Sequence, residues 1–97
     1  MTIVALLAVR HERLQAFHAY ERAAAAIMAR HGLAIDRVIA LAPDGEHHRE
    51  IHVVSCPSLL AWDAYRADPS LTALAEERAS VIVSTDMWLG TDLPPYG

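Results

Sequence analysis

The sequence has one cysteine, four glycines and no lysine. Cys56 alone cannot form a disulfide within the chain, and a lone cysteine is typical of a protein in the reducing cytoplasm. The glycines are too few and too scattered for a phosphate loop or a dinucleotide fingerprint. No Gly-x-Ser-x-Gly occurs either, so the nucleophile elbow of the α/β-hydrolases is absent.

Positive charge is also scarce: the chain has eight arginines and twelve acidic residues, and its formal net charge is −4. Without a basic cluster we expect no nucleic-acid partner. No apolar run reaches the roughly 20 residues that cross a bilayer, so we expect no membrane partner. The apolar segment 2–9 has no positive residues before it, which predicts a strand rather than a signal peptide. These features together predict a cytoplasmic protein.

Apolar residues, in contrast, are abundant: they make up 54% of the chain, against 21% for charged residues. A domain of this length buries only a modest fraction of its unfolded surface. The chain therefore carries more apolar material than a small monomer hides, and we expect a homodimer.

Hydrophobic periodicity predicts the order β-α-β-β-α-β. The expected elements are a strand over 2–9, a helix over 11–31, a strand over 33–42, a turn at 43–45, a strand ending near 55, helices over 58–82 that break at 68–69, and a strand over 84–90. Residues 81–83 fit either the last helix or the last strand. Ser58 is the candidate N-cap, and 91–97 is an extended tail.

This order predicts a single α+β domain over 1–97 with the ferredoxin-like fold, a four-stranded antiparallel sheet covered by helices on one face. The strand over 2–9 is apolar on both of its alternating sides, as in a strand that is covered on both sides. We expect the second face to be covered by the same sheet of another copy.

One stretch carries a family resemblance. Its residues are Val53-Val54-Ser55-Cys56, Pro57-Ser58, Ala61 to Arg66, Asp68-Pro69, Leu74 and Arg78, followed by Thr85 and Gly90. With them the chain resembles the dimeric α+β barrel superfamily, and within it the small DUF1330-type proteins. It departs from the pattern at Cys56, where an aromatic residue is usual, and at His52, where an apolar one is usual.

The resemblance implies a homodimer with a small-molecule cavity between sheet and helices in each subunit. The superfamily includes cofactor-independent monooxygenases, isomerases, polyketide cyclases and haem-degrading enzymes. One interpretation is therefore a cofactor-independent isomerase, cyclase or monooxygenase that acts on a small aromatic or polyketide-like molecule. The alternative is a non-catalytic module that binds a small molecule or haem.

Six histidines raise the question of a metal. His48 and His52 are four apart, a spacing that shares a metal on a helix. On a strand the same spacing spans roughly 13 Å. Because β-branched residues alternate here, we predict a strand and no metal site, with His47 and His48 in solvent.

His52 is the leading candidate for a general base. If 43–45 forms a three-residue turn, Asp36 lies directly across the hairpin from His52 and orients its ring. A two-residue turn places Arg37 there instead. A structural Asp–His hydrogen bond is the alternative to catalysis.

His18, beside Phe17 on the first helix, is the second catalytic candidate, because in this fold it projects towards the cavity. Arg78 lies within an apolar stripe, so it either pairs with an acid such as Asp63 or Asp68 or holds a substrate carboxylate or phenolate. The remaining candidates are aromatic and either bind substrate or pack in the core: Trp62, Tyr65, Phe17 and Trp88.

Overall fold

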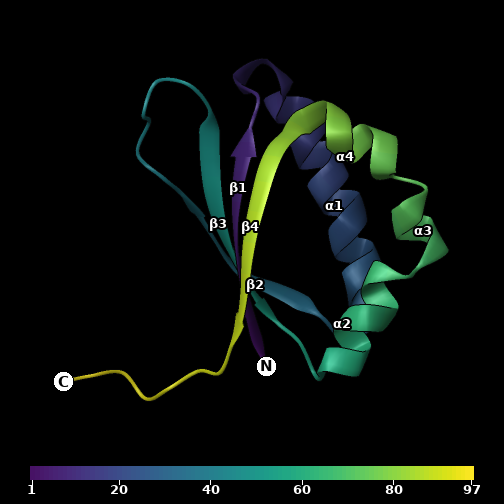
Figure 1. The fold of residues 1–97 in the computed structure, drawn as a ribbon, viewed down its shortest axis with the longest axis vertical. Helices are drawn as coiled ribbons and strands as arrows, with labels where there is room; N and C mark the ends of the chain where they lie inside the picture. The colour runs from purple at the N-terminus through teal and green to yellow at the C-terminus, as the bar shows by residue number, and fades with distance from the viewer.

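The computed structural model describes residues 1–97 and shows the expected fold, a four-stranded antiparallel sheet with all helices on one side (Figure 1). The strands lie in the order β2-β3-β1-β4. The elements are β1 Thr2–Val9, η1 His11–Arg13, α1 Leu14–Arg30, β2 Ala34–Ala40, β3 His48–Ser55, α2 Leu59–Arg66, α3 Pro69–Thr72, α4 Ala75–Val81 and β4 Ile82–Gly90. No helix combines the length and the apolar character needed to cross a bilayer.

The helices begin and end at residues whose chemistry sets those limits. The Ser58 hydroxyl accepts a hydrogen bond from the Ala61 amide at 3.1 Å, which confirms it as the N-cap of α2. Asp68 caps α3 in the same way, and Pro69 occupies the first turn. The expected helix after this break divides into α3 and α4. Val81 completes α4, and β4 begins at Ile82.

The predicted register of the β2–β3 hairpin is wrong. The ladder ends where Ala40 faces Glu50, which leaves residues 41–47 as a loop wider than a tight turn. The register also shifts between Ile35 and Arg37, which makes Asp36 a bulge residue. As a result Val38, and neither Asp36 nor Arg37, lies opposite His52.

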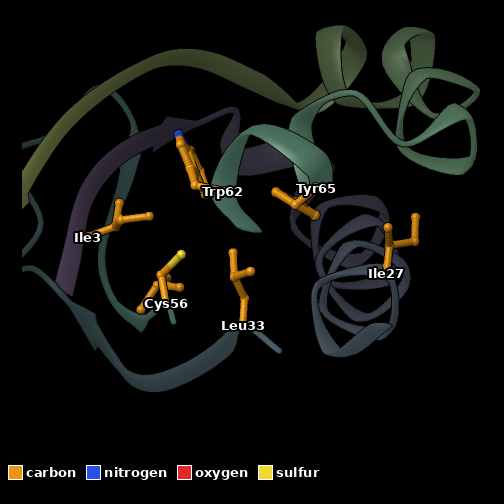
Figure 2. Close-up of a cluster of buried hydrophobic side chains, with 7 residues drawn as sticks. Ile3, Ile27, Leu33, Cys56, Trp62 and Tyr65 are labelled. Atoms are coloured by element: carbon orange, nitrogen blue, oxygen red, sulfur yellow. The ribbon is translucent and has the colours of Figure 1, made fainter. Parts of the chain in front are cut away.

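The hydrophobic core fills the layer between sheet and helices in two clusters. One gathers Cys56, Trp62 and Tyr65 around β1 and β3 (Figure 2). The other gathers Phe17, fully buried at 0% exposure, with β1 and the junction of α4 and β4. Cys56 is buried, as expected of a small core residue.

The opposite face of the sheet has no helix or strand over it (Figure 1). Its side chains include Val4, Leu6, Ile51 and Val53, all only half-buried, and Trp88, which is 55% exposed. The tail after β4 runs away from the helices (Figure 1), and Asp92 at its start accepts a hydrogen bond from the Thr2 hydroxyl.

Phe17→Ala is expected to lower the free energy of unfolding by about 3–5 kcal/mol, because it empties a closed site in the core. Urea unfolding measures the change. Leu60, 78% exposed on α2, provides the control: Leu60→Ala is expected to change stability by less than about 0.5 kcal/mol. Equal effects of the two substitutions would mean that Phe17 is not a core residue.

Candidate functional site

A cavity of 490 Å³ lies between the sheet and the helices, and 13 of its 19 lining residues are hydrophobic. Ile3, Ala5 and Leu7 of β1 line it from the sheet, and Trp62 and Tyr65 of α2 line it from the helices. Its volume falls within the range of small-molecule sites, which are mostly apolar with a few convergent polar groups. The charged and hydroxyl-bearing lining residues come from several helices and strands, and among them are Glu21 of α1, His52 of β3 and Arg78 of α4.

His52 is the one histidine that lines this cavity. Strand alternation turns it towards the helices together with Val54 and Cys56, as predicted, and it is only 5% exposed. Its Nε2 lies 2.9 Å from Oε1 of Glu50, whereas its Nδ1 lies 3.7 Å from Oε2 of Glu21. The ring is thus held on one side and open on the other.

Glu50 determines which ring nitrogen of His52 carries the proton. Burial raises the pKa of the Glu50 carboxyl, but hydrogen bonds from His52 and His48 outweigh burial and the net pKa lies below its ordinary value of 4.5. Glu50 is therefore ionised near neutral pH and only accepts hydrogen bonds. His52 therefore donates to this carboxylate from Nε2, whereas its Nδ1 makes no hydrogen bond, since 3.7 Å to Glu21 is too long for one.

Glu21 of α1 is a site residue that our sequence analysis missed. It lines the cavity, and burial raises the pKa of its carboxyl above 4.5, although the nearby His52 and Arg78 oppose the rise and Glu50 adds to it. The signal was present in the sequence. Glu21 follows Phe17 by four residues and precedes Ala24 by three, so it interrupts a core-facing stripe with a carboxylate.

Arg78 lines the cavity, but the expected salt bridge is absent, because no carboxylate oxygen lies within 4.0 Å of its guanidinium. Asp68 instead pairs with His31 at 2.8 Å. Arg78 donates to the Thr85 hydroxyl at 2.6 Å. It also lies near Tyr20, where burial raises the pKa of the phenol and Arg78 partly opposes that rise. A guanidinium with free donors therefore borders an apolar cavity.

The aromatic part of the cavity comes from α2, where the rings of Trp62 and Tyr65 lie 5.5 Å apart. The guanidinium of Arg66 lies over the indole, 5.9 Å from its centre. Burial raises the pKa of the Tyr65 hydroxyl, so this phenol keeps its proton and can donate a hydrogen bond.

Four predicted site residues lie outside the cavity. His18 is exposed, because one step along α1 from buried Phe17 turns its side chain away. Phe17 packs in the core with its ring centre 6.4 Å from that of His52. Trp88 alternates with Met87, which lines the cavity, and so it points to the open sheet face. Asp36 is exposed and accepts a hydrogen bond from Ser55 at 3.3 Å.

No group of three or more histidine, cysteine or acidic side chains is placed to hold a metal ion. The expectation that His48 stands free in solvent is wrong. Its Nε2 lies 2.6 Å from Oε2 of Glu50, and its side chain is only 22% exposed.

Comparisons with known proteins identify structures that share this fold. No family model and no curated protein matches the sequence, so the closer resemblance to DUF1330-type proteins stays a prediction. A solved structure assigned as an antibiotic biosynthesis monooxygenase from Bacteroides thetaiotaomicron superposes with a TM-score of 0.73 at 17% identity, covering 98% of this chain and 90% of that one. A Rhodopseudomonas palustris protein of unknown function gives 0.74 at 19%, covering 97% and 84%. SnoaB from Streptomyces nogalater, described as a cofactor-independent oxygenase, gives 0.62 at 18%, covering 98% and 96%. At these identities the likeness shows the ferredoxin-like fold.

The carboxyls of Glu21 and Glu50 are expected to affect stability with opposite pH dependence. The pKa of Glu21 is raised by folding, so its contribution to stability is complete below pH 4.5 and is lost as the pH rises through the folded value. The pKa of Glu50 is lowered, so its contribution is present above pH 4.5 and is lost as the pH falls through the folded value.

Urea unfolding between about pH 3 and pH 7 at one protein concentration tests both signs. Glu21→Gln should gain stability relative to the unaltered protein as the pH rises. Glu50→Gln should cost about 1–3 kcal/mol near neutral pH and less in acid. Parallel pH dependence of the two variants would contradict this arrangement of charges.

Proposed function

We propose that this protein is a cofactor-independent enzyme that removes a proton from a small aromatic or polyketide-like molecule in the cavity, with His52 as the general base. One observation carries the proposal. A buried imidazole that lines a mostly apolar cavity is bound through Nε2 to an ionised carboxylate, and its Nδ1 has no hydrogen-bond partner. An oriented ring of this kind, within reach of a bound substrate, is what general-base catalysis requires.

In the proposed step the substrate C–H or O–H bond breaks, its proton passes to Nδ1 of His52, and the electron pair stays on the substrate. The carboxylates of Glu50 and Glu21, at 2.9 and 3.7 Å, stabilise the imidazolium that forms. The developing oxyanion is stabilised by Arg78, which has no acidic partner, and by the neutral phenol of Tyr65.

The shape of the cavity supports the substrate class. Trp62 and Tyr65 offer aromatic surface, and most of the remaining lining is aliphatic. A proton abstraction of this kind begins isomerisation, cyclisation and cofactor-free oxygenation alike. The structural likeness to SnoaB, a cofactor-independent oxygenase, supports the oxygenation outcome.

Mass spectrometry of small molecules that co-purify with the protein tests the substrate class. We expect an aromatic or polyketide-like compound with an acidic hydrogen, and we expect the protein to convert it. A Soret absorption band in the purified protein would instead support the haem-binding alternative. A bound metabolite that is never converted would support a non-catalytic module.

His52→Gln is expected to lower kcat by about 10²–10⁴-fold, the usual contribution of a general base, while the protein stays folded. Turnover of the co-purified compound measures the loss, and circular dichroism checks the fold. His18→Gln is the matched control, because that histidine is exposed and outside the cavity. Full activity of His52→Gln would remove His52 from the reaction.

We also propose that the active form is a homodimer joined through the open sheet face. Leu6, Ile51 and Val53 are apolar on that face, and no element of this chain covers them. Sheet-on-sheet packing with a second copy would bury these side chains together with Trp88. In a symmetric dimer the same face of each chain forms the interface, so each apolar sheet face would cover the other.

Light scattering at low micromolar concentration is expected to give twice the 10.6 kDa chain mass. Trp88→Arg should shift the protein to the monomer, because it places a charge in the centre of an apolar interface. Leu60→Arg, at an exposed residue on the helical side, should leave the dimer intact. A monomer in the unaltered protein, or a dimer unaffected by Trp88→Arg, would contradict this interface.

A further inference from the structure

We infer that His48 is a positioning residue for the buried base: it releases a proton to solvent when His52 takes one from the cavity, because both imidazoles share the carboxylate of Glu50. The inference rests on the proposed role of His52. Oε1 of Glu50 lies 2.9 Å from Nε2 of His52, and Oε2 lies 2.6 Å from Nε2 of His48. Each oxygen is thus bound to a different ring.

Exposure rises along this row of three side chains. Counting side chains alone, His52 is 7% exposed, Glu50 9% and His48 22%. The residues alternate along β3, so all three lie on the helix-facing side of one strand. One end of the row therefore lies at the cavity, and the other end reaches solvent beside the 41–47 loop.

A single carboxylate balances one positive charge. Two imidazoliums on Glu50 would leave a net positive charge at a mostly buried site, which is costly. When either ring is protonated, the other therefore binds a proton less tightly, and the two rings titrate as a pair rather than independently.

The neighbouring strands add no charge to this row. In β1, Ala5, Leu7 and Val9 face His52, Glu50 and His48 in turn. In β2, Val38 and Ala40 face His52 and Glu50. Arg49, the other charged side chain of β3, binds Asp44 of the loop at 3.1 Å.

The helices contribute one charged neighbour, Glu21 of α1, at the His52 end of the row. Arg78 of α4 acts on Glu21 and so tempers its effect. When Glu21 is ionised it favours the charged form of His52 over that of His48. Burial acts in the opposite direction, because the His52 side chain is 7% exposed and the His48 side chain 22%, so desolvation favours the positive charge on His48 before the reaction.

The coupled step balances in charge. Before the reaction His48 is an imidazolium on the Glu50 carboxylate, and His52 is neutral. A substrate proton then binds Nδ1 of His52, the electron pair of the broken bond stays on the substrate, and His48 gives its Nδ1 proton to water. Glu50 keeps its charge throughout, and no proton has to pass through it.

Nuclear magnetic resonance of the ¹⁵N-labelled protein tests the coupling without a substrate. In the unaltered protein we expect each of the two rings to titrate in two steps. In His48→Gln the His52 ring should titrate in one step, with its midpoint raised by about 1 pH unit, the coupling at which two sites titrate as a pair. His47→Gln, at the adjacent histidine that binds no side chain, should leave the His52 curve unchanged.

A one-step His52 curve with the same midpoint in the unaltered protein and in His48→Gln would overturn the inference. Because His48 is half-buried at the end of a strand, its substitution should not unfold the protein, and the two-step curve of the unaltered protein tests the coupling independently. Coupled titration in a protein that converts no substrate would refute the proposed function and leave the coupling standing. Turnover without coupled titration would refute the coupling and leave the proposed function standing.

Discussion

The candidate site depends on the pairing of one buried carboxylate. Glu50 lies at the sheet surface under the helices, where an ionised group is stable only if both of its oxygens are bound. His48 and His52 meet that requirement from either side along the same strand. In meeting it they are themselves held in place: Nε2 of His52 is bound to Glu50, and its Nδ1 has no hydrogen-bond partner. The way in which the Glu50 charge is paired on the sheet therefore sets how the His52 imidazole is held beside the cavity.

The element order could be predicted from the sequence because it depends on local signals. Strand alternation placed His52 and Cys56 on the helix side, and the Ser58 hydroxyl marked the start of α2. The eight residues of β1 alone show that the strand is apolar on both of its faces. Each of these features is set by neighbours in the chain and by the period of the backbone.

The contacts within the site could not be predicted in the same way, because they depend on register and on competition between partners. The bulge at Asp36 and the wide 41–47 loop follow from where the whole β2–β3 ladder is most stable, which no turn residue specifies. Asp68 was a reasonable partner for Arg78, but His31 lies closer in space. The sequence shows Glu21 as a carboxylate within the core-facing stripe of a helix. Its part in the site depends on its contact with His52, which lies thirty-one positions later in the sequence.

The likeness to antibiotic biosynthesis monooxygenases extends over nearly the whole chain at 17% identity. At that level the shared property is the arrangement of backbone elements, which many unrelated reactions use. The proposal for this chain therefore rests on its own cavity, above all on Glu21, Glu50 and His52. The apolar lining and the unpaired Arg78 indicate what kind of molecule fits beside them.

Strand β3 serves two surfaces at once. Glu50 and His52 face the helices, while Ile51 and Val53, between and beside them, face the uncovered side of the sheet. Because adjacent residues share one peptide backbone, a shift of the strand moves the side chains on both of its faces. If a second subunit packs there, ligand binding in one cavity and the fit between subunits would be mechanically linked through a single layer. Such a link would let the two cavities of a dimer influence one another without any moving lid or hinge.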